Sequence, residues 1–197
     1  RRFSALWVHR GVCCECEGAA RAAGRCPFSE GCKPSWFCPH ARCCFKCEAH
    51  SCDECRLSRG DGEHVAQLAA RLRPARLALD FDRTLATTRS GGMPVMGKDS
   101  LDSDLLPVLW EHQAACMVVT RNSHVSEIGA FLAAHGAPEK VPVHSLKRPR
   151  SKAEFILPGL GDDEIAVFVD DTVAELVDPL VANDKRVHRV LFIRGLL

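Results

Sequence analysis

The distribution of cysteine is the feature that most constrains this chain. Eleven of the twelve cysteines lie between Cys13 and Cys55, and the remaining one is Cys116. The segment around the eleven contains few aliphatic residues, so it cannot bury a core large enough to fold without disulfides or bound metal. The glycine-containing stretch 58–62 that follows has the composition of a linker. The sequence therefore predicts a cysteine-rich module over residues 1–60, followed by a separate domain.

The spacing of these cysteines favours zinc over a disulfide framework. Three Cys-x-x-Cys pairs are present, at positions 13/16, 44/47 and 52/55. A spacing of two residues places both sulfurs on one tetrahedral metal, and an odd number of cysteines argues against complete disulfide pairing. Thiolate ligands indicate a reducing intracellular compartment, the cytoplasm or the nucleus. The candidate zinc ligands are Cys13, Cys16, Cys26, Cys32, Cys38, His40, Cys43, Cys44, Cys47, His50, Cys52 and Cys55.

The number and pairing of the zinc sites follow only in part from the sequence. Eleven cysteines and two histidines can serve at most three sites of four ligands, so we expect about two or three structural Zn²⁺ ions. The ligands can be shared in interleaved order, as in cross-braced fingers, or in sequential order, and the spacing does not choose between these. Cys14 can also be a bystander.

Composition excludes several classes of protein. An apolar content of 46% and a charged content of 26% over 197 residues are typical of one or two globular domains. No apolar run approaches the roughly 18 residues of a membrane span, so we expect no membrane partner. A net charge of +1 does not support an electrostatically driven nucleic-acid binder. Because the chain starts with Arg1 and no leader pattern follows, we expect a fragment or a processed chain.

Apolar runs and helical periodicity alternate over residues 75–197. This alternation predicts a Rossmann-like, doubly wound parallel sheet of the α/β class, joined to the module by a linker helix within residues 61–74. A segment rich in Thr, Ser, Gly and Pro, residues 86–98, is expected to form a flap or hairpin loop. The predicted strands span 76–81, 115–119, 141–144, 165–169 and 187–193, and the predicted helices span 63–72, 101–112 (capped by Ser100), 121–135 and 151–157.

Polar residues follow the ends of these predicted strands. Asp80 and Asp82 emerge from the first strand and, two residues apart, can point into one site. Crowded carboxylates repel each other unless a proton or cation intervenes, and Mg²⁺ prefers such oxygen ligands. Taken alone, Asp-x-Asp-x-Thr is equally compatible with a strand end that carries acidic turn residues. Asp170 and Asp171 end a later strand and extend the acidic set.

Three further residues are candidates for binding phosphate. Thr120 ends the second predicted strand and faces the start of a helix, where backbone N–H groups favour anions. Arg121 follows it directly. Lys152 lies in the first turn of a short predicted helix, where a positive charge opposes the helix dipole, so a role beyond helix stability is indicated.

Four motifs in this order resemble those of the haloacid dehalogenase-like superfamily of phosphohydrolases. The resemblance covers about residues 75–197. The segment Asp80–Thr84 is similar to the first motif, Val118–Thr120 to the second, Lys152 to the third and Val169–Asp171 to the fourth. Each motif is weak alone, but four in order at strand ends or helix starts are specific. Arg83 departs from the pattern, because many members carry glycine there.

The resemblance implies a Mg²⁺-dependent phosphatase. Asp80 would attack phosphorus as the nucleophile, and Asp82 would protonate the leaving oxygen and later activate water. The metal would be held by Asp80, by the backbone carbonyl of Asp82 and by Asp170, with Asp171 acting through water. The expected phosphate-binding residues are Thr120, Lys152 and Arg121.

Motif spacing bears on the substrate. Members of the superfamily insert cap domains between motifs, but here 35 residues separate Thr84 from Thr120 and 31 separate Thr120 from Lys152. The predicted elements fill both stretches, so no room remains for a sizeable cap. Capless relatives act on phosphate carried by macromolecules or cover the site with another domain, and the cysteine-rich module is a candidate for that cover.

Two substrate classes and one different function remain open. Nucleic-acid 3′-ends and phosphoproteins are close rivals, and the basic run Lys147–Arg150 slightly favours a polyanionic substrate. The alternative is a zinc interaction module whose phosphatase-like domain is a scaffold with little or no turnover.

Overall fold

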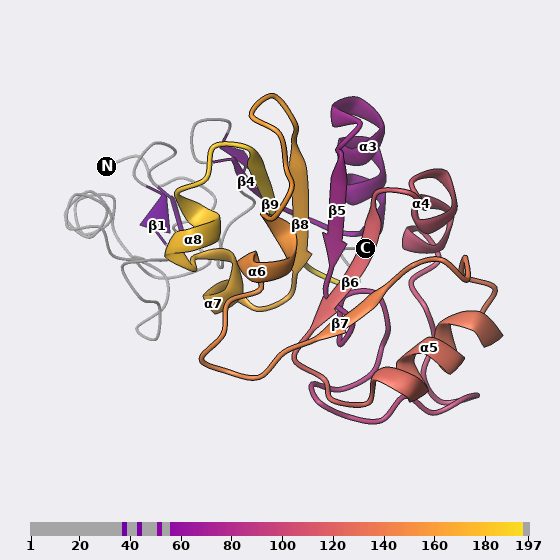
Figure 1. Ribbon diagram of the computed structural model, residues 1–197. Helices are drawn as coiled ribbons and strands as arrows, with labels where there is room; N and C mark the ends of the chain where they lie inside the picture. Colours follow the sequence, from indigo (N-terminus) through magenta and orange to yellow (C-terminus); the bar gives the residue numbers. More distant parts are fainter. Residues whose placement is uncertain (1–36, 39–42, 45–50, 53–55, 195–197) are drawn as a thin grey trace, which may run out of the picture. The chain divides into compact units, whose positions relative to one another are not determined.

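The computed structural model describes residues 37–38, 43–44, 51–52 and 56–194 (Figure 1). The chain divides into two compact units, Arg1–Arg59 and Gly60–Leu197. No helix among the described residues combines the length and the apolar character needed to cross a lipid bilayer.

The first unit contains short antiparallel strand pairs. Strand β1 (Phe37–Cys38) pairs with β2 (Cys43–Cys44), so that Cys38 lies opposite Cys43. Strand β3 (Ser51–Cys52) pairs with the first residues of β4 (Leu57–Gly60). The other predicted zinc ligands lie outside the described residues: Cys13, Cys16, Cys26, Cys32, His40, Cys47, His50 and Cys55.

The second unit is built on a parallel β-sheet, as the sequence predicted. Within the described residues, the strands β5 to β9 pair in parallel in the spatial order β9-β8-β5-β6-β7. The chain runs outward from β5 through β6 to β7, then returns to β8 on the other side of β5. The strands are β5 (Arg76–Leu79), β6 (Cys116–Thr120), β7 (Val143–Ser145), β8 (Ala166–Asp170) and β9 (Val187–Phe192).

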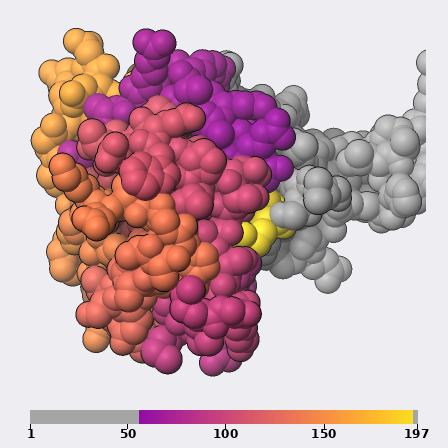
Figure 2. All heavy atoms as spheres, turned by 90° about the vertical axis from the view of Figure 1, so that its right-hand side faces the viewer, coloured from indigo at the N-terminus to yellow at the C-terminus, as the bar shows by residue number. Residues whose placement is uncertain are grey.

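Both faces of this sheet are covered, which explains why its strands are continuous apolar runs. Leu77 and Leu79 of β5 join the main hydrophobic core, while Ala78 between them is equally buried outside that cluster. Alternate residues of a strand point to opposite faces, so each face has its own apolar cover. Figure 1 shows α3, α4 and α5 grouped apart from α6, α7 and α8. Figure 2 shows the side on which the segments of α4, α5 and β7 lie at the surface.

The helices differ from the sequence expectation mainly at their starts. Helix α3 (Gly62–Leu72) begins where the Asp61 side chain accepts a hydrogen bond from His64 N, and its buried Val65, Leu68 and Ala69 belong to the core. The residues expected to form a linker helix therefore contribute to the second unit itself. The other helices are α4 (Leu105–Glu111), α5 (Val125–Ala134), α6 (Ala153–Ile156), α7 (Val173–Leu176) and α8 (Pro179–Ala182).

The prediction that Ser100 caps the helix after the flap is wrong. Leu101 instead forms an antiparallel bridge with Ala86, so the chain is still extended there. Asp102 Oδ1 accepts hydrogen bonds from Asp104 N and Leu105 N, which delays the start of α4. Pro107 is the third residue of α4. Proline has no backbone N–H group, and it is accommodated there because the N–H groups of the first helical turn have no carbonyl partner within the helix. Residues 86–98 contain no helix, as predicted for a flap.

Candidate functional site

The candidate site lies between the neighbouring strands β5 and β8, where the strand order of the sheet reverses. From β5 the chain continues to β6 on one side of the pair, and from β8 it continues to β9 on the other side. Open α/β sheets bind ligands in the crevice at such a switch point, beyond the carboxyl ends of the strands. Asp80 directly follows β5, Asp170 ends β8, and Asp80 N continues the ladder by donating to Val169 O at 2.9 Å.

A buried lysine links the two strand ends. Lys152 Nζ donates to Asp80 Oδ1 at 2.6 Å and to Asp170 Oδ2 at 2.7 Å. All three side chains are almost inaccessible, with exposures of 1%, 8% and 1% for Lys152, Asp80 and Asp170. Lysine and aspartate are almost never fully buried unless they are paired. Three segments far apart in the sequence therefore meet in one charged cluster.

An acidic trio at this point could hold a metal ion. One carboxylate oxygen from each of Asp80, Asp170 and Asp171 lies within 4.8 Å of the others. Carboxylate oxygens are the ligands that hard cations such as Mg²⁺ take in proteins, so the donor set fits such an ion. The carboxylate of Asp82 is not part of this trio.

The electrostatics of the cluster favour an added positive charge. Burial raises the pKa of Asp80 well above its usual range, and the charge of Asp170 raises it further, against the effect of Lys152. Burial also raises the pKa of Asp170. For Lys152, burial acts to lower the pKa, but the charges of Asp170 and Asp80 outweigh it and keep the ammonium protonated. One ammonium therefore faces more than one buried carboxylate, an excess of negative charge that a cation would neutralise.

Asp82 has hydrogen-bond partners of its own, which are the flap and Asn122. Asn122 Nδ2 donates to Asp82 Oδ1 at 2.9 Å and to Gly92 O at 2.7 Å, while Gly91 N donates to Asp82 Oδ2 at 2.6 Å. Asn122 is fully buried. Burial raises the pKa of Asp82, and the hydrogen bonds from Gly91 and Asn122 oppose that rise. A carboxyl group with a raised pKa is suited to exchange a proton.

The predicted phosphate-binding residues differ in the partners that surround them. Thr120 is fully buried at the end of β6, and its Oγ1 accepts from Asn122 N at 3.1 Å. Arg121 forms a two-point ion pair with Glu175, with Nε–Oε1 and Nη2–Oε2 distances of 3.1 and 2.7 Å. Arg121 Nη1 also donates to Arg150 O at 2.7 Å. The guanidinium of Arg121 is thus committed to protein partners, whereas Lys152 lies inside the acidic cluster.

The turn after Asp82 requires an unusual backbone. Arg83 has a φ of +59°, in the left-handed region that favours glycine. The next residue, Thr84, is fully buried, and its Oγ1 accepts from Asp171 N at 3.1 Å. The turn thereby ties the segment after β5 to the segment after β8.

Sequence reasoning missed Asn122 and Glu175 as contributors to the site. Asn122 lies two residues after Thr120, but its partners in the flap and at Asp82 are 30 and 40 residues away along the chain. Glu175 lies in α7, 54 residues from Arg121. A polar residue soon after a strand-end motif was the available signal for Asn122. No comparable pattern marked Glu175.

Comparisons with protein-family models, with curated proteins and with solved structures found no match to this chain.

Proposed function

We propose that the second unit is a Mg²⁺-dependent phosphatase of the haloacid dehalogenase-like type, acting on a phosphate monoester carried by a macromolecule. The observation that carries the proposal is the meeting of Asp80, Lys152 and Asp170 through hydrogen bonds of 2.6 and 2.7 Å. These residues come from the first, third and fourth motifs named above. Nucleic-acid ends and phosphoproteins are both compatible with this proposal, and the zinc-binding role of the first unit belongs to it.

The proposed reaction assigns a role to each carboxylate. An oxygen of Asp80 attacks phosphorus, the bond between phosphorus and the leaving oxygen breaks, and that oxygen takes the proton of Asp82. Water then attacks the phosphorus of the aspartyl-phosphate and gives its proton back to Asp82. The phosphorus–oxygen bond to Asp80 breaks, which releases inorganic phosphate and restores both side chains.

The remaining residues of the site neutralise negative charge and orient the carboxyl group of Asp82. Lys152 carries a buried positive charge beside Asp80 and stabilises the negative charge that gathers on the phosphoryl oxygens. Asp80, Asp170 and Asp171 would hold Mg²⁺, which when bound supplies neutralisation of the carboxylates and of the phosphate dianion. Asn122 and Gly91 hold the two oxygens of Asp82, so its carboxyl group is oriented before the substrate binds.

The decisive experiment measures phosphate release by the full-length protein. With para-nitrophenyl phosphate, we expect turnover with Mg²⁺ and none with a chelator. Asp80→Asn removes the nucleophile in a nearly isosteric way, so kcat should fall at least about a thousand-fold. Asp104→Asn, at an exposed position before α4, is the matched control and should retain activity.

Two outcomes would contradict the proposal. A wild-type rate in Asp80→Asn would rule out the covalent step. Absence of turnover in the wild type, on this ester, on 3′-phosphorylated oligonucleotides and on phosphopeptides, would favour the scaffold alternative.

A further inference from the structure

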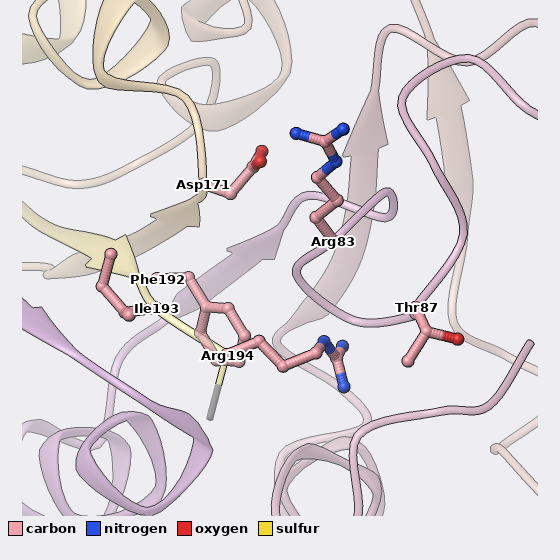
Figure 3. Close-up of a pocket in the computed structure, with 6 residues that line it drawn as sticks. All are labelled: Arg83, Thr87, Asp171, Phe192, Ile193 and Arg194. Atoms are coloured by element: carbon pink, nitrogen blue, oxygen red, sulfur yellow. The ribbon is translucent and has the colours of Figure 1, made fainter. Parts of the chain in front are cut away.

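A pocket beside the acidic trio has no role in the proposed reaction. Its volume is about 340 Å³, and its lining residues are Arg83, Thr87, Asp171, Phe192, Ile193 and Arg194. All of them belong to the second unit. Asp171 also belongs to the acidic trio, so the pocket and the candidate metal site are adjacent. Figure 3 shows Arg83 and Asp171 together at one end of the pocket, with Arg194 and Thr87 further along it.

The two arginines of the pocket differ in how they are held. Arg194 is anchored, since Nη2 donates to Thr84 O at 2.6 Å and Nη1 lies 3.2 Å from Asp102 Oδ2. The exposed guanidinium of Arg83 has no hydrogen-bond or ion-pair partner within the part of the chain that the structure describes. A guanidinium presents a planar set of donors that matches a carboxylate or phosphate.

The backbone of Arg83 strengthens the case for a ligand. Its φ of +59° costs an L-residue about 1 kcal/mol relative to glycine, and no hydrogen bond or ion pair of its side chain with the described residues offsets that cost. Residues held in such sparsely populated conformations cluster at functional sites. The strain and the unpartnered charge occur at the same residue, directly after Asp82 and on the wall of a pocket.

We propose that this pocket binds an acidic side chain of a phosphopeptide substrate, next to the residue that carries the phosphate. The inference rests on the proposed function. An extended peptide advances about 3.3 Å per residue, so a pocket that shares Asp171 with the reaction centre is within reach of a side chain one or two residues from the phosphate.

Two observations favour a peptide over a nucleic acid. Single-stranded nucleic acid is usually held by stacking of its bases on aromatic rings. Phe192 is the aromatic residue of the pocket lining, and it is only 2% exposed, so it offers almost no ring surface. The flap that holds Asp82 exposes Met93, Val95 and Met96 by 53%, 42% and 56%. Methionine adapts its shape to varied apolar side chains, which suits a peptide.

The test compares kcat/KM of the full-length protein on paired phosphopeptides. Each pair carries Glu or Gln at one position before or after the phosphorylated residue. We expect at least one Glu peptide to be preferred by about tenfold, as for a hydrogen bond between two charged groups. In Arg83→Asn, whose side chain tolerates the left-handed backbone, this ratio should fall to about one. Arg83→Lys should retain part of the preference for the Glu peptide. Arg89→Asn, which replaces an exposed arginine of the flap, should retain all of it.

The outcomes separate the two levels of the proposal. Turnover of both peptides without a preference, or a preference that survives in Arg83→Asn, overturns the pocket assignment and leaves the phosphatase in place. A 3′-phosphorylated oligonucleotide with a higher kcat/KM than every phosphopeptide overturns the peptide class. No turnover of any of these substrates or of para-nitrophenyl phosphate overturns both levels.

Discussion

Asn122 Nδ2 lies 2.9 Å from Asp82 Oδ1 and, through its second hydrogen, 2.7 Å from Gly92 O. One buried amide therefore joins the candidate general acid to the flap. Its Oδ1 is also engaged, accepting from His124 N at 3.0 Å. The orientation of Asp82 and the position of residues 91–92 depend on the same side chain.

Asn122→Ala should impair the proposed reaction without unfolding the protein. Asp82 would lose one of the two bonds that orient it, so we expect kcat on para-nitrophenyl phosphate to fall by about ten- to a hundred-fold. Circular dichroism should show an unchanged fold. Ser123→Ala, at the exposed neighbouring position, is the matched control. An unchanged kcat in Asn122→Ala would mean that Asp82 does not need this bond.

Lys152→Met should make the stability of the second unit depend on Mg²⁺. The variant leaves Asp80 and Asp170 without their ammonium partner, and breaking a buried ion pair costs about 3 kcal/mol. In a chelator, Tm should fall by roughly 5–10 °C. Added Mg²⁺ should raise Tm more in the variant than in the wild type, because the cation then neutralises carboxylates that no lysine pairs.

The control for this comparison is Lys147→Met, which removes an exposed lysine from the basic run. Its Tm should match that of the wild type with and without Mg²⁺. If Lys152→Met melts like the control in a chelator, the lysine does not bridge the two carboxylates in solution.

Cys116 should be unreactive in the folded protein. The thiol is buried in β6, and burial raises its pKa to about 12. Only the thiolate is alkylated, and at pH 8 about one thiol in ten thousand would be ionised. Iodoacetamide should therefore leave the Cys116 peptide unmodified between about pH 7 and pH 9, and modify it readily in urea. Site-resolved mass spectrometry gives the answer, and equal labelling in both conditions would contradict the burial of this residue.

Long apolar segments made the architecture predictable. The runs around Leu77, Val118 and Val167 are buried strands because a parallel sheet covered on both faces needs apolar residues at every position. The nearness of the carboxylates at the strand ends was then also predictable, because the carboxyl ends of parallel strands lie at the same edge of the sheet. The helices α7 and α8, of four residues each, were not predicted, because a single turn shows no helical period. Helix α6 is equally short, and its prediction rested on the longer segment 151–157.

Side-chain partnerships were less predictable than backbone placement. Arg121 was expected to bind phosphate, yet its guanidinium is paired with Glu175, and no local pattern shows that α7 comes near it. Asp80 and Asp82 were predicted from strand alternation to point into one site. That pattern does not reveal their hydrogen-bond partners, which are Lys152 for Asp80 and Asn122 and Gly91 for Asp82. Long-range contacts of this kind depend on packing, which a single sequence does not encode locally.

The first unit should contain zinc. Its eleven cysteines accompany few aliphatic residues, so metal binding should supply most of the folding free energy of residues 1–59. Elemental analysis of protein purified in a reducing buffer should find about two or three Zn²⁺ per chain. A strong chelator should unfold this unit, as judged by rapid proteolysis before residue 60, while residues 60–197 stay protected by their own core. Replacing both Cys52 and Cys55 by alanine should lower the zinc content of the protein. Cys116→Ala should leave the zinc content unchanged, because Cys116 lies in β6 of the other unit.

A protein that contains no zinc, and whose mass indicates disulfides, would contradict the prediction and would point to an oxidising compartment instead.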